Sequence, residues 1–253
     1  MFDSLVGDAT SLLDGRFPWA AGFAALAGFV RGFSGFGAAL IFIPLANIPY
    51  DPATAIIALW VIDAVASAPL LPPHLRRAAW REVVPLLVGS AVAMPFGVWI
   101  LSHTDPYELR LGVCGMVLIS TLCLASGWRY RQAPTLPVTL SVGGVAGFTS
   151  GAVGIGGPPL VLFWLAGQAN AVQARSNIFA YFALTTFTAI GPYIWQDLFT
   201  ARRLVLGAAL TPVYALTMTL GDRLFRRTGE TAFRQVAFWL CAAAAILGLP
   251  MWR

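Results

Sequence analysis

Long apolar runs separated by short polar stretches make up most of the chain. A helix needs about 20 apolar residues to cross a hydrocarbon core of about 30 Å, and eight segments can be marked on that basis. The pattern predicts an all-α polytopic membrane protein in which residues 1–253 form a single membrane domain. A weaker amphipathic pattern at 2–13 indicates a helix on the membrane surface. The expected segments are 19–46, 53–72, 83–101, 109–127, 136–166, 170–195, 204–220 and 235–250.

A glycine-rich stretch near the start of the chain recurs in the second half. A shift of 119 positions aligns residues of the first stretch with identical residues of the second, where chance would supply about one match in eleven. The duplication predicts two homologous four-segment repeats, residues 19–127 and 136–250, each opening with a glycine-broken helix. The matched residues are Ala27, Gly28, Phe29, Gly32, Gly35 and Gly37 in the first stretch and Ala146, Gly147, Phe148, Gly151, Gly154 and Gly156 in the second.

Both stretches interrupt apolar segments in a way that an ordinary helix does not continue. Glycine loosens the backbone, and the pair Pro158 and Pro159 removes donors and clashes with the preceding turn. The leading piece 19–30 corresponds to about 18 Å of helix, so we expect the first break near the bilayer midplane. Paired broken helices usually mark a transporter's binding site, because the freed amides and carbonyls need partners. The alternative is that the glycines only allow close helix packing; we favour the binding site.

The relative direction of the two repeats is left open by the sequence. If all eight segments cross, the repeats are parallel. If each glycine-rich segment instead enters and returns on one side as a re-entrant hairpin, each half has three crossings and the repeats are inverted. The arginines outside the core segments divide nine to five in both arrangements, so the positive-inside rule does not choose. We favour inverted repeats, which place the arginine clusters at 76–81, 129–131 and 223–234 on one side.

Composition supports a membrane location and excludes several classes of function. The chain is 58% hydrophobic and 11% charged, against roughly 25% charged residues in a soluble domain. Its formal charge of +5 comes mostly from arginines between apolar segments, which are topology signals rather than nucleic-acid contacts. The cysteines form no CxxC, and His74 and His103, which we expect in connecting loops, show no metal-ligand spacing. We therefore expect no catalytic residues, metal or other cofactor. The sequence has no ATP-binding P-loop, so we expect a gradient or a partner protein as the driving force.

Arg31 is the first candidate for a substrate-binding residue. It lies in the first glycine stretch, where a guanidinium is costly unless it meets an anion, for which its fork of donors is well suited. Backbone amides at the breaks and nearby polar side chains complete the expected anion site, although the hydroxyls equally suit bonding to their own helices. These further residues are Gly32, Ser34, Gly35, Gly37, Thr149, Ser150, Gly151, Gly154, Gly156 and Asn177.

Asp63 stands near the centre of the second segment, where an acid has to face protein or water rather than lipid. Two interpretations are equally open. An Arg31–Asp63 ion pair holds two helices together and does nothing else. Alternatively, Asp63 is displaced or protonated when an anion reaches Arg31, and protonation would make protons the coupling ion. Arg175 lies near the start of the sixth segment, and we expect it to extend to the membrane interface.

The two glycine stretches, the repeat spacing and the length of 253 residues resemble the sulfite exporter TauE/SafE family of membrane permeases. The resemblance covers essentially the whole chain. It implies a secondary transporter of the bacterial inner membrane, often an exporter, for sulfite, sulfoacetate, another sulfonate or a related anion. The first stretch departs from the more glycine-rich form, since Ala38 and Ala39 stand where the second has Gly157 and Pro158. The alternatives are an anion channel and a membrane assembly or scaffold factor without cargo.

Overall fold

The computed structural model describes residues 15–109, 135–166 and 171–227, and also residues 111, 112, 115, 119 and 122. The regular structure of this part of the chain is entirely helical. Five stretches within it are long and apolar enough to cross a membrane. The protein is therefore an all-α, multi-pass membrane protein, as the apolar pattern predicted. The candidate spans are Pro52–Arg77, Trp80–His103, Leu136–Val153, Val172–Trp195 and Ala201–Phe225.

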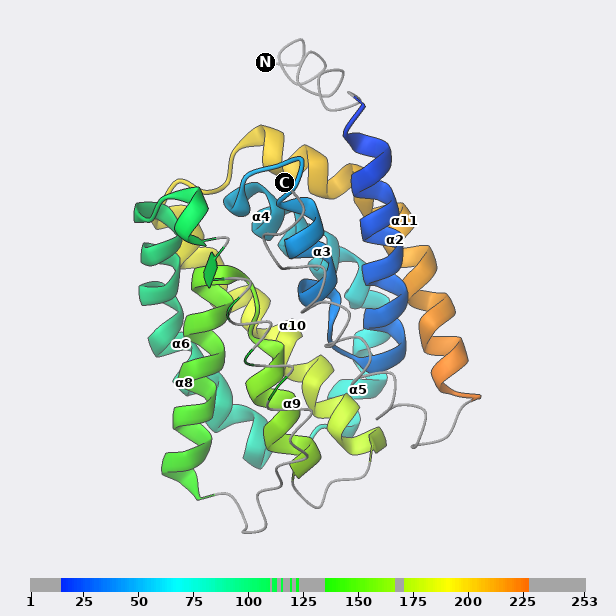
Figure 1. Ribbon diagram of the computed structural model, residues 1–253. Coiled ribbons are helices and arrows are strands. Elements are labelled where there is room, and N and C mark those ends of the chain that lie inside the picture. The colour runs from blue at the N-terminus through cyan, green and yellow to red at the C-terminus, as the bar shows by residue number, and fades with distance from the viewer. Residues whose placement is uncertain are drawn as a thin grey trace.

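The helices follow one another along the chain as labelled in Figure 1. Of the predicted segments, 109–127 lies largely and 235–250 wholly outside the described residues, as does the surface helix expected at 2–13. The elements are α2 (Phe17–Ser34), α3 (Ala38–Ala46), α4 (Pro52–Ser67), the 3-10 helix η1 (Ala68–Leu70), α5 (Leu71–Arg77), α6 (Trp80–His103), α8 (Leu136–Val153), α9 (Gly157–Ala166), α10 (Ala171–Trp195) and α11 (Ala201–Phe225).

α2 is longer than the leading piece that the sequence predicted. The helix ends at Ser34 rather than near Val30, and it therefore includes Arg31. Its 18 residues correspond to about 27 Å of helix. Gly35 follows with a φ of 80°, and Gly37 has a φ of 89° directly before α3 begins. In the second half, α8 is followed by Gly154 with a φ of 73°. This left-handed backbone favours glycine, because a Cβ atom would be strained there.

The connection after α4 is helical where a loop was predicted. Pro72 and Pro73 occupy the first turn of α5, where their missing N–H groups break no bond and their fixed φ suits a helix. The chain therefore stays helical as far as Arg77, and His74 lies within α5. His103 is the last residue of α6. The prediction that both histidines lie in loops is wrong.

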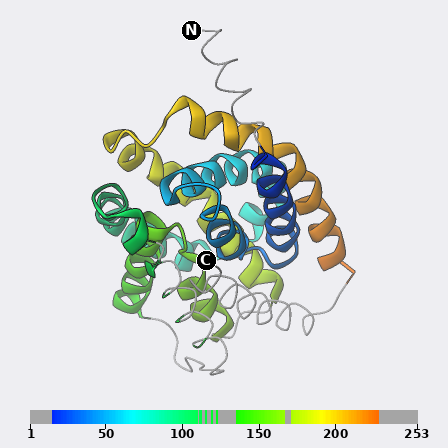
Figure 2. The ribbon, with the colours of Figure 1, turned by 45° about the horizontal axis from the view of Figure 1, so that its top comes forward.

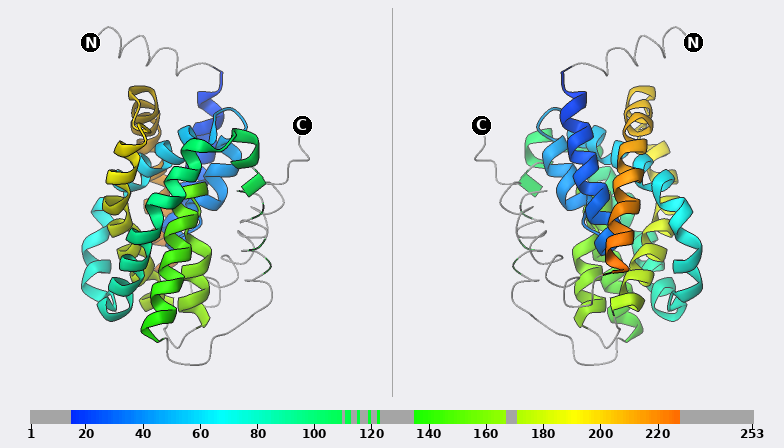
Figure 3. Two further views of the ribbon diagram at one scale, coloured as in Figure 1. Left: turned by 90° about the vertical axis from the view of Figure 1, so that its left-hand side faces the viewer. Right: turned by 90° about the vertical axis from the view of Figure 1, so that its right-hand side faces the viewer.

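The long helices pack in two pairs that join distant parts of the sequence. α2 packs along α11, and α6 packs along α8. Figures 2 and 3 show these pairs on opposite sides of the molecule, with α2 and α11 drawn dark blue and orange and α6 and α8 in shades of green. Each long helix pair is extended by a third helix, since α4 packs on α11 and α10 packs on α6.

Glycines set the close approach within both pairs. A Cβ atom on Gly32 would lie 1.9 Å from the carbonyl oxygen of Met218, and one on Gly151 would lie 2.6 Å from that of Met94. Backbones that approach this closely gain van der Waals contact, which drives helix association in a membrane. Gly32 and Gly151 therefore serve the close packing that was the alternative explanation for the glycine stretches.

α2 with α3, and α8 with α9, form two helical hairpins. The two helices of each hairpin contact one another. In Figure 1, α2 runs down from the N-terminal side and α3 returns towards it, whereas α8 runs up from the opposite side and α9 returns down. The turns between the helices, at 35–37 and 154–156, thus lie inside the molecule, next to the cavity described below.

Candidate functional site

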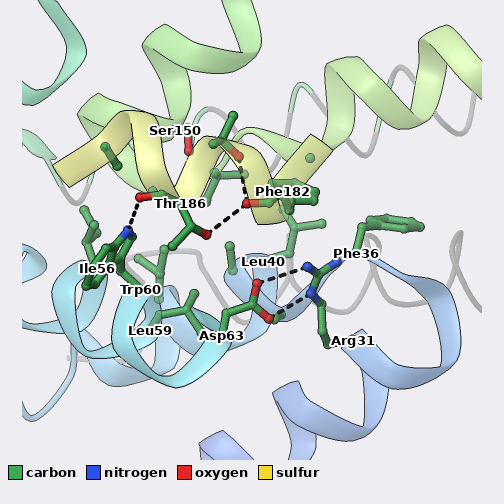
Figure 4. Close-up of a pocket in the computed structure, with 18 of the residues that line it drawn as sticks. Arg31, Phe36, Leu40, Ile56, Leu59, Trp60, Asp63, Ser150, Phe182 and Thr186 are labelled. Carbon is green, nitrogen blue, oxygen red and sulfur yellow. Dashed lines mark hydrogen bonds and ion pairs between the residues drawn. The ribbon is translucent and has the colours of Figure 1, made fainter. Parts of the chain in front are cut away.

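A cavity lies beside the turns of the two hairpins, between α3, α4, α9 and α10 (Figure 4). The empty space within it, open solvent included, amounts to about 760 Å³. The lining is mostly apolar, which is typical of a site that fixes a small ligand with a few polar groups. The polar or partly polar side chains in it are Arg31, Trp60, Asp63, Ser150, Thr185, Thr186 and Tyr193.

Arg31 and Asp63 form a two-pronged ion pair at one end of the cavity (Figure 4). Nε of Arg31 donates to Oδ1 of Asp63 at 2.9 Å, and Nη2 donates to Oδ2 at 3.0 Å. The third nitrogen, Nη1, donates to the carbonyl of Gly35 in the hairpin turn. The guanidinium carbon lies 4.6 Å from the ring centre of Phe179 and 5.0 Å from that of Phe182. Arg31 is thereby held in one orientation by its own hairpin, by α4 and by α10.

The Asp63 carboxylate receives donors from three helices. Besides Arg31, the hydroxyl of Tyr214 on α11 donates to it at 2.9 Å, and that of Ser67 on α4 donates at 3.1 Å. The Asp63 side chain is 20% exposed, whereas that of Arg31 is 2% exposed. Asp63 is thus the more accessible member of the pair. The charge of Asp63 cancels that of Arg31. An anion can therefore pair with the guanidinium only if Asp63 gives up part of its contact with Arg31.

Five of the residues predicted for the site line this cavity. Arg31, Gly37 and Asp63 come from the first half of the chain, and Ser150 and Gly154 from the second. Ser150 lies on the opposite wall of the cavity from Asp63 (Figure 4). The structure therefore brings the two glycine stretches together around one space.

The other predicted site residues do not line the cavity. Gly32 and Gly151 pack against neighbouring helices, and a Cβ atom on Gly156 would lie 2.6 Å from the carbonyl oxygen of Ala146. The hydroxyls of Ser34 and Thr149 donate to carbonyls one turn back, those of Val30 and Val145. The last two are Gly35, whose carbonyl accepts from Arg31, and Asn177, which accepts from the N–H of Ala79 and donates to Glu82.

Two of the amides expected to cradle an anion already have acceptors. The N–H of Gly35 donates to the carbonyl of Arg31 at 2.8 Å, and that of Gly154 donates to the carbonyl of Ser150 at 3.0 Å. Both bonds close the last turn of a helix, which is the usual role of a left-handed glycine at a C-terminus. Side chains, rather than these two amides, are the donors that face the cavity.

Several cavity residues were not predicted. Phe182, Thr185, Thr186 and Tyr193 line it from α10, and their spacing of three, four and seven residues places them on one helix face. Trp60 on α4 donates from Nε1 to the carbonyl of Thr186 at 3.2 Å and so connects the two halves of the chain. The helical spacing on α10 was visible in the sequence, but nothing in it pairs Trp60 with that face.

We expected Arg175 to extend to the membrane interface, but the structure buries it. Its side chain is 5% exposed, and Nη2 lies 2.7 Å from Oδ1 of Asp222. The same nitrogen donates to the carbonyl of Gly32. Asp222 lies inside α11, which continues to Phe225 through a stretch predicted to be a loop. A buried acid on α11 is what retains Arg175 in the interior, and the prediction for Arg175 is wrong.

No group of three or more metal-ligating side chains comes together in the part of the chain that the structure describes. The His74 side chain is buried among neighbouring helices. Its ring stacks on Phe179 with centres 4.3 Å apart, and Nδ1 lies 3.3 Å from the hydroxyl of Ser176.

Comparison with known proteins gives one family and one curated relative. The family described as "Sulfite exporter TauE/SafE" matches residues 20–247. The relative is the "Probable sulfite/organosulfonate exporter TauE" of Cupriavidus necator, which is 26% identical over 235 residues that cover 88% of this chain and 90% of the relative. No solved structure matches the chain.

Proposed function

This chain belongs to the sulfite exporter TauE/SafE family, and we propose that it is a secondary transporter that exports sulfite or an organosulfonate across the bacterial inner membrane. The family expected from the glycine stretches is confirmed. Members of this family are transporters rather than enzymes, and the apolar helices make this chain a multi-pass membrane protein. The substrate, its site and the direction of transport belong to the proposal.

The Arg31–Asp63 pair at the end of the cavity is the observation that carries the proposal. A guanidinium offers five N–H groups, and the bonds that the structure describes use three of those on Arg31. The remaining N–H groups suit the oxygens of a sulfite or sulfonate group, which they hold by charge-assisted bonds. Ser150, across the cavity, is positioned to supply a further hydroxyl donor. The apolar remainder of the cavity suits the carbon chain of an organosulfonate.

Asp63 acts in this proposal as a competitor that keeps the empty site neutral. When an anion binds Arg31, the carboxylate withdraws and keeps the hydroxyls of Tyr214 and Ser67 as donors. Release of the anion restores the ion pair, and while the anion is bound the two hydroxyls stabilise the withdrawn carboxylate by hydrogen bonds. If Asp63 takes up a proton when it withdraws, transport is coupled to protons; that coupling stays a prediction.

The repeats 19–127 and 136–250 belong to the same proposal, and equivalent contacts support them. Under the shift of 119 positions, Gly28 corresponds to Gly147 and Phe29 to Phe148. A Cβ atom on Gly28 would meet the carbonyl of Tyr214 on α11, and one on Gly147 would meet that of Ser90 on α6. In the reverse direction, Gly221 on α11 packs on the carbonyl of Phe29, and Gly97 on α6 packs on that of Phe148. Helix pairs α2–α11 and α8–α6 are therefore built alike.

The opposite directions of the two hairpins support inverted rather than parallel repeats. α2–α3 enters from one side of the molecule and α8–α9 from the other (Figure 1), as two re-entrant hairpins of inverted repeats do. Substrate sites in such transporters lie where the broken helices meet. We propose that the glycine-flanked turns allow one half to rock against the other and expose Arg31 to each side in turn.

Replacing Asp63 with asparagine is expected to tighten sulfite binding by about tenfold and to slow exchange. The variant keeps a side chain of similar size but removes the negative charge. The anion then no longer competes with the Asp63 carboxylate for Arg31. A tenfold change in affinity corresponds to about 1.4 kcal/mol, which is in the range of a single hydrogen bond to a charged group. The measurement is the rise in melting temperature of the purified protein with sulfite concentration.

The same melting experiment separates candidate substrates. A panel of sulfite, sulfate, thiosulfate, sulfoacetate, taurine and simple carboxylates identifies the preferred anion. A purely structural ion pair predicts that Asp63→Asn lowers the melting temperature and that no anion restores it. That outcome would remove the competitor role from Asp63.

A further inference from the structure

A second buried cluster of charges lies outside the cavity, where α10 meets α11. Arg175 lies 2.7 Å from one oxygen of Asp222, and Arg226 lies 2.9 Å from the other. Two guanidinium groups thus share one carboxylate, which gives the cluster a net positive charge. The Arg226 side chain is 65% exposed, so the cluster extends from the interior to the surface. In the described part of the chain, Nε of Arg175 is buried and has no hydrogen-bond partner.

Phe179 connects this cluster to Arg31. Its ring centre is 5.1 Å from the guanidinium carbon of Arg175 and 4.6 Å from that of Arg31. Arg175 also donates to the carbonyl of Gly32, the residue after Arg31. Phe179 is fully buried and does not line the cavity, whereas Phe182, one turn further along α10, does. Phe179 therefore contacts the guanidinium groups of both Arg31, which lines the cavity, and Arg175.

The order of side chains on α10 indicates a route. Arg175, Phe179, Phe182 and Thr186 follow one another at intervals of three or four residues, which places them along one face of the helix. The cavity occupies the later part of this face. An anion that left Arg31 along this face, away from the cavity, would meet Phe179 first and Arg175 next, with the exposed Arg226 beyond them.

We propose that Arg175 is a second anion-binding position on the transport route, and that Phe179 is the closed gate between it and Arg31. This inference rests on the proposed function, and its ligand is the same sulfite or sulfonate group. The unpartnered Nε supplies the first donor to the arriving anion. Asp222 keeps Arg226 as its partner while Arg175 turns to the anion, so the carboxylate is never left without a compensating charge.

The competing explanation is that Arg175 only braces the turn of α2 that carries Arg31. The two explanations predict different results for sulfite binding and exchange when both members of the buried pair are made neutral. Arg175→Gln alone leaves Asp222 with one partner and can weaken the fold. Arg175→Gln combined with Asp222→Asn removes both buried charges and keeps a polar side chain at each position. A bracing role predicts that the folded double variant loses sulfite binding at Arg31 together with exchange, whereas an anion position predicts that exchange falls and binding is kept.

The test measures binding and flux separately on the purified full chain. Labelled sulfite is the probe, equilibrium binding is measured in detergent, and exchange is measured in liposomes. The double variant is expected to bind sulfite with an affinity within about twofold of wild type, because Arg31 is intact. Its exchange rate is expected to fall at least about tenfold, the size of one lost charge-assisted hydrogen bond. Arg223→Gln, an exposed neighbour on α11, is the matched control and should exchange as wild type does.

The gate is tested with Phe179→Leu, which keeps an apolar side chain but removes the ring that both guanidinium groups contact. Passive leak of labelled sulfite without a counter-anion is expected to rise several-fold. Exchange at the wild-type rate in the folded double variant would overturn the second position, and unchanged leak in Phe179→Leu would overturn the gate. If wild-type protein binds no sulfite at all, the proposed function fails instead, and this outcome is distinct from the other two.

Discussion

Replacing Arg31 with glutamine is expected to reduce sulfite binding and exchange by at least about 100-fold. Glutamine keeps a polar side chain but lacks the charge and the fork of donors. Two charge-assisted bonds of about 1.5 kcal/mol or more each are lost, and about 1.4 kcal/mol corresponds to a factor of ten in affinity. The measurements are equilibrium binding of labelled sulfite in detergent and its exchange in liposomes that contain the purified protein.

Loss of folding has to be separated from loss of binding in this variant. Arg31→Gln leaves the partly buried carboxylate of Asp63 without its cation, which costs up to about 3–5 kcal/mol, the range for breaking a buried pair. The double variant Arg31→Gln with Asp63→Asn removes both charges and is expected to fold while binding no anion. Arg202→Gln, at an exposed position of α11, is the matched control. A folded double variant that exchanges sulfite at the wild-type rate would return Arg31 to a purely structural role.

Replacing Gly32 with alanine is expected to destabilise the protein by about 1–3 kcal/mol or more, the usual effect of overpacking. The new Cβ atom would lie 1.9 Å from the carbonyl oxygen of Met218. Because that atom belongs to the backbone of α11, no side-chain rotation relieves the clash, and the two helices have to move apart. The measurement is the apparent melting temperature in detergent.

Gly22 on the same helix provides the control, because a Cβ atom there has nothing within 4 Å. Gly22→Ala is expected to be neutral or to stabilise α2 by up to about 1 kcal/mol, since alanine is the better helix former. The duplicated packing predicts that Gly151→Ala is destabilising as well. Equal melting temperatures for Gly22→Ala and Gly32→Ala would show that close approach of α2 to α11 is not what requires glycine at position 32.

Helical segments were predictable because their cause is local. The runs at 83–101 and 170–195 appear as α6 and α10, with ends displaced by a few residues. Length and apolar content fix such helices, since a bilayer leaves the backbone few other ways to satisfy its donors and acceptors. The helix at His74 was not predicted; Pro72 and Pro73 stand in its first turn, where proline is well tolerated.

The candidate site was only partly predictable, because it is assembled from both halves. Arg31 and Asp63 could be paired from their similar depth, and the structure places them 2.9 Å apart. Tyr214 and Trp60 could not be assigned, since each acts on a residue more than a hundred positions away. The predicted segment 204–220 ends before Asp222, whereas α11 continues past it to Phe225. The burial of Asp222 is decided by Arg175 on another helix, which is information that local pattern does not contain.

Counterflow of labelled sulfite in liposomes that contain only the purified wild-type protein tests the central claim most directly. A secondary transporter with one alternating site predicts saturable uptake that is accelerated by unlabelled sulfite or organosulfonate on the opposite side. Non-saturating flux that ignores the opposite side would indicate a channel. The absence of any flux from folded protein would contradict the account and favour an assembly or scaffold factor without cargo.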